Sequence, residues 1–409
     1  MKLVTLIVTA LLTTALSAQT TVTVTTGVGN ATQTFYSLQN GVQTSAPNAE
    51  WDLAFEISGF SGSILANTAK GMQVYKAPFS VAQWASVDTA GLAATWSQQH
   101  NSEISWSAGA LNQGLTEDEF DLGWGVYNMI THTVLGDSVF VVKLVNGDWK
   151  KLRIDGLATS TYMFTWANLD GSNEQTGSLN KTLYVGKNFG YFSLENNIAQ
   201  DREPATTAWD LVFTKYIAFV PTAYGVAGAL QNKNTQVLQV DGVDPAIAEW
   251  WDDEFSADIN TIGYDWKTFN MTTFEYEYPL DRTYFVQDQL GNVWKLIYTG
   301  YGGSATGDMT FTQELVSATS VEENATQGTV VVYPNPVANG QAQLLVNVPS
   351  GRVVATVHDL SGKLVRQQLL TGLNGLSLRT IDVNGLQQGL YVVRLEGNGV
   401  STTTRLVIE

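Results

Sequence analysis

Two nearly identical strings lie far apart in this 409-residue chain, and they limit its fold more than any other feature. "EWDLAF" occupies residues 50–55, and "AWDLVF" occupies residues 208–213. Further landmarks accompany each string in the same order: "FYSLQNG" (35–41) and "YFSLENN" (191–197), "MQVYK" (72–76) and "TQVLQ" (235–239), "WGVYNM" (124–129) and "WKTFNM" (266–271), "VFVVKLVNGDWKKL" (139–152) and "TYFVQDQLGNVWKL" (283–296). Ordered matches of this kind indicate a tandem duplication. We expect the two copies at residues 19–178 and 179–318.

Strands dominate the pattern within each copy. β-branched and aromatic runs such as "VFVVKL", "VWKLIYTG" and "DMTFTQEL" alternate with Gly, Asn and Asp turns. Short helices are expected only at "SVAQW" (80–84) and "DPAIAEWW" (244–251). In the second of these, Asp244 suits an N-cap and Pro245 the first helical position. The sequence therefore predicts an all-β fold with two tandem antiparallel β-rich domains and little helix.

The Trp-Asp pair of each copy suits a buried strand. In an extended strand, Trp209, Leu211 and Phe213 share one face while Asp210 points to the other, and the first copy repeats this pattern. Buried aromatic side chains dominate the energetics of cores. We therefore interpret the Trp-Asp pairs as framework, with each Asp accepting from local backbone donors, and not as catalytic residues.

Both ends of the chain differ from the copies. Residues 1–18 contain one Lys, an apolar run and then small residues, which is the layout of a cleaved signal peptide. The run is shorter than the ~20 apolar residues that a membrane span needs, and no later segment is long enough. At the other end, a polar linker (319–328) precedes residues 329–409, where "QLLVNV", "VVATVHDL" and "YVVRLEG" alternate. This alternation predicts a small β-sandwich.

The C-terminal segment resembles a known family. It contains, in order, "YPNP" (333–336), "VHDLSGKLV" (357–365), "GLQQGLYVVRL" (385–395) and a terminal "TTRLVIE". These motifs are similar to those of the type A C-terminal sorting domain of the type IX secretion system of Bacteroidota, over residues 328–409. The resemblance implies export across the outer membrane by that machinery, and a secreted or surface-located protein. It implies no chemistry, so His358 is expected to be an ordinary strand residue.

The duplicated region is similar to the HmuY-like haem-binding family. The second copy carries the resemblance through "YFSLEN", "WDLVFTKY", "YFVQDQLGNVWKLIYTGY" and "GDMTFTQEL", whereas the first departs at "FEISGF". The resemblance implies an extracellular binding protein for haem or another tetrapyrrole. It carries over no axial ligand, because the family's ligands lie on loops that differ between members. The lipid-bearing Cys that is usual there is missing, since the chain has no cysteine.

Haem iron needs an axial His or Met inside an apolar and aromatic wall. His132 follows Met129 by three residues in "NMITHTV", and Met271 is the equivalent of Met129 in the second copy. Met129 and His132 could face one iron only if a loop or a bulge lies between them. Alternatively, both Met residues fill a repeated core and His132 is a surface histidine. His100 is a further candidate, because it lies in a polar loop flanked by aromatic residues.

Composition and motifs narrow the classes of function. The chain has 38 Asp and Glu against 21 Lys and Arg, and the resulting charge of −17 disfavours nucleic acid as a partner. No G-x-S-x-G, H-E-x-x-H or Walker motif occurs, and the acidic cluster at 249–258 lacks the pattern of a calcium loop. We therefore expect a non-enzymatic binding protein. One alternative is a surface adhesion module that uses Trp250, Trp251 and Tyr301 on glycan or protein, and the last is a carboxylate-based hydrolase.

Overall fold

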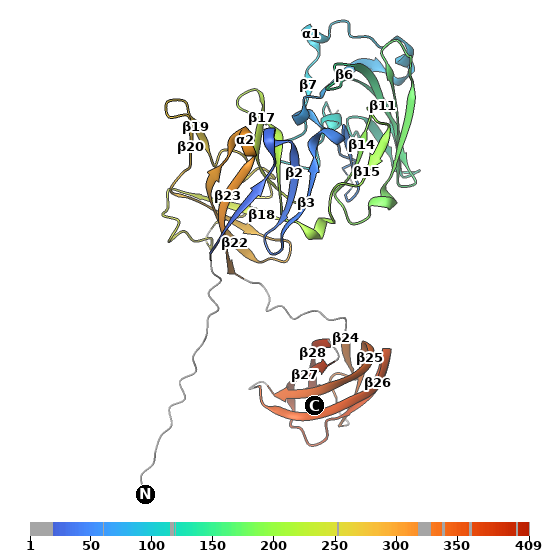
Figure 1. Cartoon of the computed structure of the whole chain (residues 1–409). Helices are drawn as coiled ribbons and strands as arrows, with labels where there is room; N and C mark the ends of the chain where they lie inside the picture. The colour runs from blue at the N-terminus through green and yellow to red at the C-terminus, as the bar shows by residue number, and fades with distance from the viewer. Residues whose placement is uncertain are drawn as a thin grey trace. The chain divides into compact units, whose positions relative to one another are not determined.

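The computed structural model describes residues 19–59, 61–114, 118, 120–251, 253–317, 329–337, 340–359, 362–397 and 400–408. The chain divides into two compact units, Met1–Thr319 and Ser320–Glu409, called unit 1 and unit 2 below (Figure 1). The signal peptide predicted at residues 1–18 and the linker predicted at 319–328 lie outside the described residues. No helix within the described ranges is long and apolar enough to cross a membrane.

Unit 1 contains two large antiparallel sheets that repeat one strand order. The first sheet runs β13 (Gln175–Asn180), β12 (Thr161–Asn168), β11 (Trp149–Ala158), β10 (Ser138–Lys143), β6 (Gln73–Ser80) and β7 (Gln98–Gln99), and β9 (Thr133–Gly136) joins β11 to β8 (Gly125–Asn128). The second runs β1 (Thr20–Thr25), β23 (Asp308–Ser317), β22 (Val293–Tyr301), β21 (Arg282–Gln287) and β18 (Gln236–Asp241). The matched strings at 139–152 and 283–296 thus run along β10–β11 and β21–β22. The all-β prediction is confirmed.

Two smaller sheets also repeat one order. One runs β15 (Ile198–Gln200), β14 (Phe189–Ser193), β4 (Leu53–Glu56) and β5 (Ile64–Ala66). The other runs β3 (Gly41–Pro47), β2 (Thr32–Ser37), β16 (Leu211–Phe219) and β17 (Ala223–Gln231). In both, a strand that begins at a Trp-Asp string pairs with a strand from the matched "FYSL" or "YFSL" string.

This pairing crosses between the two sequence copies. β2 precedes the first Trp-Asp string, yet it pairs with β16, where Tyr36 lies opposite Leu211. β14 follows the first copy in sequence, yet it pairs with β4, where Tyr191 lies opposite Ala54. β1 likewise pairs with β23, and in Figure 1 the blue opening strands lie among the yellow and orange strands of the second copy. The opening strands of each copy therefore complete sheets of the other copy.

Each large sheet covers a hydrophobic core that contains a tryptophan, and the two tryptophans come from a pair of matched strings. Trp124 of "WGVYNM" is fully buried in one core, together with Phe55 and Phe164. Trp266 of "WKTFNM" is fully buried in the other, together with Phe311. The matched strings thus occupy equivalent places in space as well as in sequence.

Helix is as scarce as the sequence predicts. The α-helices of the described residues are α1 (Leu92–Thr95) and α2 (Gly303–Thr306), and the stretch expected to be helical in the first copy forms the 3-10 helix η4 (Val81–Ser86). The prediction of a helix after Asp244 is wrong. The Asp244 carboxylate does accept the N–H of Ala246 at 2.9 Å, but the chain makes a single turn there. Lys295 donates to the carbonyl of Pro245, the acceptor that a continuing helix would use.

Unit 2 is a β-structure with one core. Its strands are β24 (Thr329–Tyr333), β25 (Gln341–Asp359), β26 (Leu364–Asp382), β27 (Gly389–Gly397) and β28 (Val400–Ile408). β25 pairs with β24 through its first half and with β27 through its second half. Leu344 and Val357, one from each half, are buried in the same core. His358 lies within β25, as expected of a strand residue.

Candidate functional site

The carboxylates of the two Trp-Asp strings hold the exchanged strands in place. Asp52 accepts the N–H of Leu194 at 2.7 Å, and Asp210 accepts the N–H of Leu38 at 2.8 Å. Each leucine follows a strand of the other copy, so each Asp caps the turn after an exchanged strand. Burial raises the pKa of Asp210 to about 6. Both side chains are buried, which gives the strings the framework role expected of them. The prediction that Trp209 shares a face with Leu211 and Phe213 is wrong, because Trp209 packs in another core cluster, and Trp51 of the first copy does the same.

Sequence reasoning missed a repeated asparagine that supports the same junctions. The Asn67 side chain donates to the carbonyl oxygens of Asn48 and Trp51, at 2.6 and 3.0 Å. Asn232 does the same in the second copy, at 2.8 Å to Thr206 and 2.6 Å to Trp209. The only signal in the sequence is an Asn after each strand that follows a Trp-Asp string, in "ILAN" and "ALQN".

The predicted methionine ligands lie at the tips of two matched hairpins. Met129 belongs to the turn between β8 and β9, and Met271 to the turn between β19 (Thr268–Asn270) and β20 (Glu275–Glu277). Their side chains are 62% and 74% exposed, so neither fills a core. In the first turn, the Asn128 carboxamide accepts two backbone N–H groups, and Asn270 does so in the second. The Met side chains are thus exposed on turns that an Asn side chain caps by accepting backbone N–H groups.

The predicted histidines lie in different places. His132 ends the β8–β9 turn at a φ of 55°, and Phe274 takes the same place in the second copy at 59°. The loop that a joint Met129 and His132 site requires is therefore present. The Nδ1 atom of His132 lies 2.8 Å from the hydroxyl of Tyr127. His100 packs edge-on against Phe219, and burial lowers the pKa of His100.

A cleft of about 390 Å³ lies beside the β8–β9 hairpin. Tyr127 and His132 line it from the hairpin, Leu157 from the end of β11, and Lys181 from the turn after β13. The other lining residues are apolar or glycine: Gly59, Gly62, Phe120, Leu122 and Val134. Burial lowers the pKa of Lys181. Among the described residues that line this cleft, His132 is the only one of the four predicted iron ligands.

A cleft of about 810 Å³ lies at the equivalent place in the second copy. Phe269, Tyr276 and Tyr301 line it at the positions that Tyr127, Val134 and Leu157 hold in the first copy. Tyr224, Lys215 and Lys267 also line it. The same elements thus wall a cleft in both copies, but the wall is more aromatic in the second.

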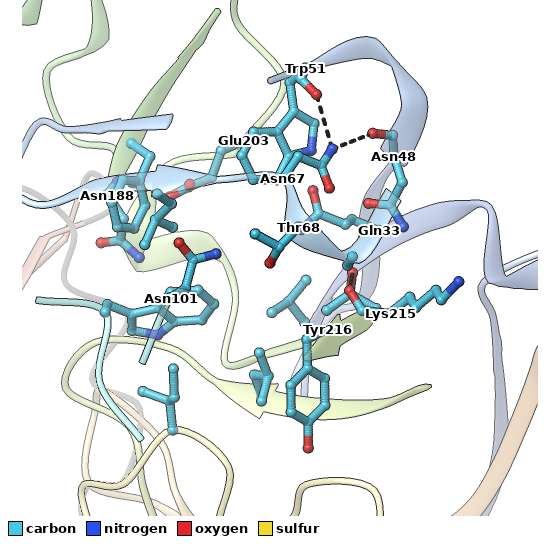
Figure 2. A pocket seen from close by; sticks show the side chains of 18 of the residues that line it. Gln33, Asn48, Trp51, Asn67, Thr68, Asn101, Asn188, Glu203, Lys215 and Tyr216 are labelled. Atoms are coloured by element: carbon cyan, nitrogen blue, oxygen red, sulfur yellow. Dashed lines mark hydrogen bonds between the residues drawn. The ribbon is translucent and has the colours of Figure 1, made fainter. Parts of the chain in front are cut away.

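A third hollow lies between the copies (Figure 2). Its walls include Trp51 and Trp209, and Figure 2 shows the Asn67 amide bonded beside Trp51 at one end, with Tyr216 at the other. The Glu203 carboxylate accepts the N–H of Asn188 at 2.8 Å and the hydroxyl of Tyr191 at 2.9 Å. Burial raises the pKa of Glu203 to about 7.

Volume separates this hollow from the clefts. Small-molecule sites usually occupy roughly 300 to 1,000 Å³. The hollow between the copies measures about 70 Å³, whereas both clefts fall in the usual range. Both clefts are therefore large enough to be binding sites, and they are the candidates because the same elements wall them in both copies, whereas the hollow is a gap in the packing of the two copies.

The predicted exposed tryptophans lie outside the clefts. Trp251 is 65% exposed and packs against Trp250, with ring centroids 4.2 Å apart and the ring planes tilted by 30°. Trp250 packs on a separate core cluster with Phe285. Of the three aromatic residues proposed for adhesion, Tyr301 lines a cleft, whereas Trp250 and Trp251 do not.

Comparison with known proteins identifies the C-terminal segment. Residues 331–409 match the family described as "Secretion system C-terminal sorting domain". The predicted sorting domain is thereby confirmed, and the protein is a secreted protein of the cell surface. No curated protein matches the chain.

One solved structure, described as "Biofilm associated protein - BSP domain", is similar to the chain at 12% identity. The alignment covers 98% of this chain and 68% of that chain, with a TM-score of 0.16. At that score the likeness supports no statement about fold or function.

Proposed function

We propose that unit 1 is an extracellular, non-enzymatic binding protein that takes a ligand in the equivalent cleft of each copy. The observation that carries the proposal is the repetition of the cleft itself. In both copies a hairpin with a capped turn and the end of the neighbouring long strand form its walls. Three of the shared wall positions differ in chemistry, namely Tyr127 and Phe269, Val134 and Tyr276, and Leu157 and Tyr301. The two clefts therefore suit different ligands.

Haem is the ligand that we propose for the first cleft, in line with the HmuY-like resemblance. The Tyr127 hydroxyl engages Nδ1 of His132, which leaves Nε2 as the nitrogen for iron. The side chains of Phe120, Leu122 and Leu157 would cover the macrocycle, and the Lys181 ammonium would neutralise a propionate. Bound haem would supply an iron atom that the His132 imidazole could bind.

A haemin titration of residues 19–409 tests this proposal. We expect a saturable Soret band that is lost or shifted in His132→Asn, because Asn tolerates the positive φ of this position but offers no imidazole. Phe274→Asn makes the same change in the matching turn of the second copy and should leave the band unchanged. If wild-type protein gives no saturable Soret change, the haem proposal fails.

A saccharide is the second candidate, and the second cleft favours it. Tyr224, Phe269, Tyr276 and Tyr301 place several aromatic rings along one open cleft. Aromatic faces pack well against the apolar faces of sugar rings while polar groups at the rim bind hydroxyls. Binding of oligosaccharides is measurable by calorimetry, and Tyr276→Ala should weaken it. An unchanged affinity in Tyr276→Ala would remove this cleft from the proposal.

A further inference from the structure

We propose that the second cleft selects an acidic saccharide, with Lys267 as the residue that binds its carboxylate. This inference rests on the saccharide proposal for that cleft and deepens it. The observation behind it is an ammonium group held at the cleft wall with no anionic partner.

Lys267 is fixed by contacts that leave its charge uncompensated. Its Nζ donates to the carbonyl oxygens of Ala227 at 2.7 Å and Tyr264 at 3.1 Å. The same atom lies 4.1 Å from the ring centroid of Trp266 and 4.5 Å from that of Tyr301. Two of the three N–H donors of the ammonium are thereby used, and one remains for a ligand. The rings and carbonyls orient the group, but none of them carries a negative charge.

The charges around the cleft favour an anion. Lys215 also lines the cleft, and in Figure 2 its side chain extends away from the hollow between the copies. Asp265 is the acidic residue of the wall, and its carboxylate already pairs with Arg282 at 3.2 Å. Within the described part of the chain, neither Lys215 nor Lys267 forms an ion pair. Two unpaired cations therefore line one cleft of a protein whose net charge is −17.

Burial gives a second indication that the charge of Lys267 lacks compensation. It lowers the pKa of Lys267 to about 7, even though Asp265 acts in the opposite direction. A carboxylate bound beside the ammonium would stabilise the charged form and add a charge-assisted hydrogen bond. In the first copy the position of Lys267 holds Gly125, whose added Cβ would lie 2.5 Å from the Leu135 carbonyl oxygen. A cation at this wall position is therefore found in the second cleft and not in the first.

The ligand class follows from these groups together. Several aromatic rings favour a sugar ring, and the unpaired ammonium groups favour a carboxylate attached to it. A uronic acid combines the two features in one residue. The cleft volume of about 810 Å³ has room for a short oligosaccharide.

Two disaccharides that differ only in the carboxylate provide the test. Cellobiouronic acid and cellobiose are titrated into residues 19–409 by calorimetry at pH 6 and low salt. We expect the acid to bind about tenfold more tightly, as a charge-assisted contact should give. Lys267→Met should abolish the preference, so that this variant binds the acid no more tightly than it binds cellobiose. Lys143→Met, which removes a lysine over Trp149 on another sheet, is the charge-matched control and should keep the preference.

The outcomes separate the two proposals. If both sugars bind equally, or if Lys267→Met keeps the preference, the acidic-saccharide inference fails while the saccharide proposal stands. If neither sugar binds, the saccharide proposal for this cleft fails, and the inference fails with it. Should Lys267→Met not fold, Lys215→Met takes its place, and we expect it to reduce the preference for the acid at least threefold, in line with a salt-sensitive contact. An unchanged preference in that variant would overturn the inference.

Discussion

The two Trp-Asp strings offer a matched pair of substitutions, Asp52→Asn and Asp210→Asn. Both carboxylates are buried, and both accept a leucine N–H from the turn after an exchanged strand. Only Asp52 also forms an ion pair, at 2.7 Å with Lys70, whose side chain is 7% exposed. We expect the same chemical change to have opposite effects on stability at the two sites.

The magnitudes follow from burial and charge. Asp52→Asn leaves a buried ammonium without its carboxylate, which costs about 3 to 5 kcal/mol. For Asp210, burial raises the pKa to about 6, so ionisation opposes folding, and this penalty grows from about pH 4 to reach ~3 kcal/mol above pH 6. Asn removes the penalty and weakens a hydrogen bond worth about 1 kcal/mol. Asp210→Asn should therefore stabilise the fold by about 2 kcal/mol at pH 8 and destabilise it by up to about 1 kcal/mol at pH 4, where little of the penalty remains.

Urea unfolding of residues 19–409, followed by tryptophan fluorescence, measures both effects. All 12 Trp residues precede residue 319, so the signal reports unit 1 without a contribution from unit 2. Unfolding midpoints at pH 4 and pH 8 give the free energies. An equal loss of stability in the two variants at pH 8 would refute the reasoning, because it would mean that the two carboxylates have the same electrostatic role.

Three further predictions follow from the same structure. Since burial raises the pKa of Glu203 to about 7, the wild type should lose up to ~3 kcal/mol as the pH rises from 4.5 to 7, and Glu203→Gln should flatten this slope in urea titrations. Trp209→Ala should lower the free energy of unfolding by about 3 to 5 kcal/mol, whereas Trp251→Ala, at a largely exposed site, should lower it by less than about 1 kcal/mol. Similar losses in the two variants would contradict the framework role of Trp209. Removal of residues 329–409 should leave the chain in the periplasm on cell fractionation, and surface delivery of the truncated chain would contradict the role of the sorting domain.

The fold class was predictable because its signals are local. Alternation and turn residues mark strands wherever they occur, and the ordered landmarks marked the repeat. The partner of each strand was not predictable. Tyr36 and Tyr191 come from nearly identical strings, so local sequence fits either Trp-Asp strand equally well. Pairing depends on which sheet buries the strand, and this is a tertiary property.

The candidate site was predictable only in part. The sequence singled out His132, Met129 and Met271 as matched loop residues, and they lie on matched hairpin turns. It did not indicate the clefts, because their walls come from segments far apart in the chain, such as Lys181 beside the β8–β9 hairpin. Lys267 gave no signal either, since a lysine in "WKTFNM" looks like an ordinary surface residue. Its unpaired state depends on the carbonyls and rings around it.

The strand exchange explains how one framework supports two different clefts. The residues that join the copies are nearly the same in both: Trp, Asp, the Ser-Leu turn and the supporting Asn. The variable cleft residues, such as Tyr127 and Phe269, lie on hairpins that take no part in the exchange. A change there alters the wall of one cleft without disturbing the pairing that holds both copies together. Ligand specificity can therefore differ between the copies. A change at Asp52 or Asp210 instead alters the attachment of a strand that one copy contributes to a sheet of the other.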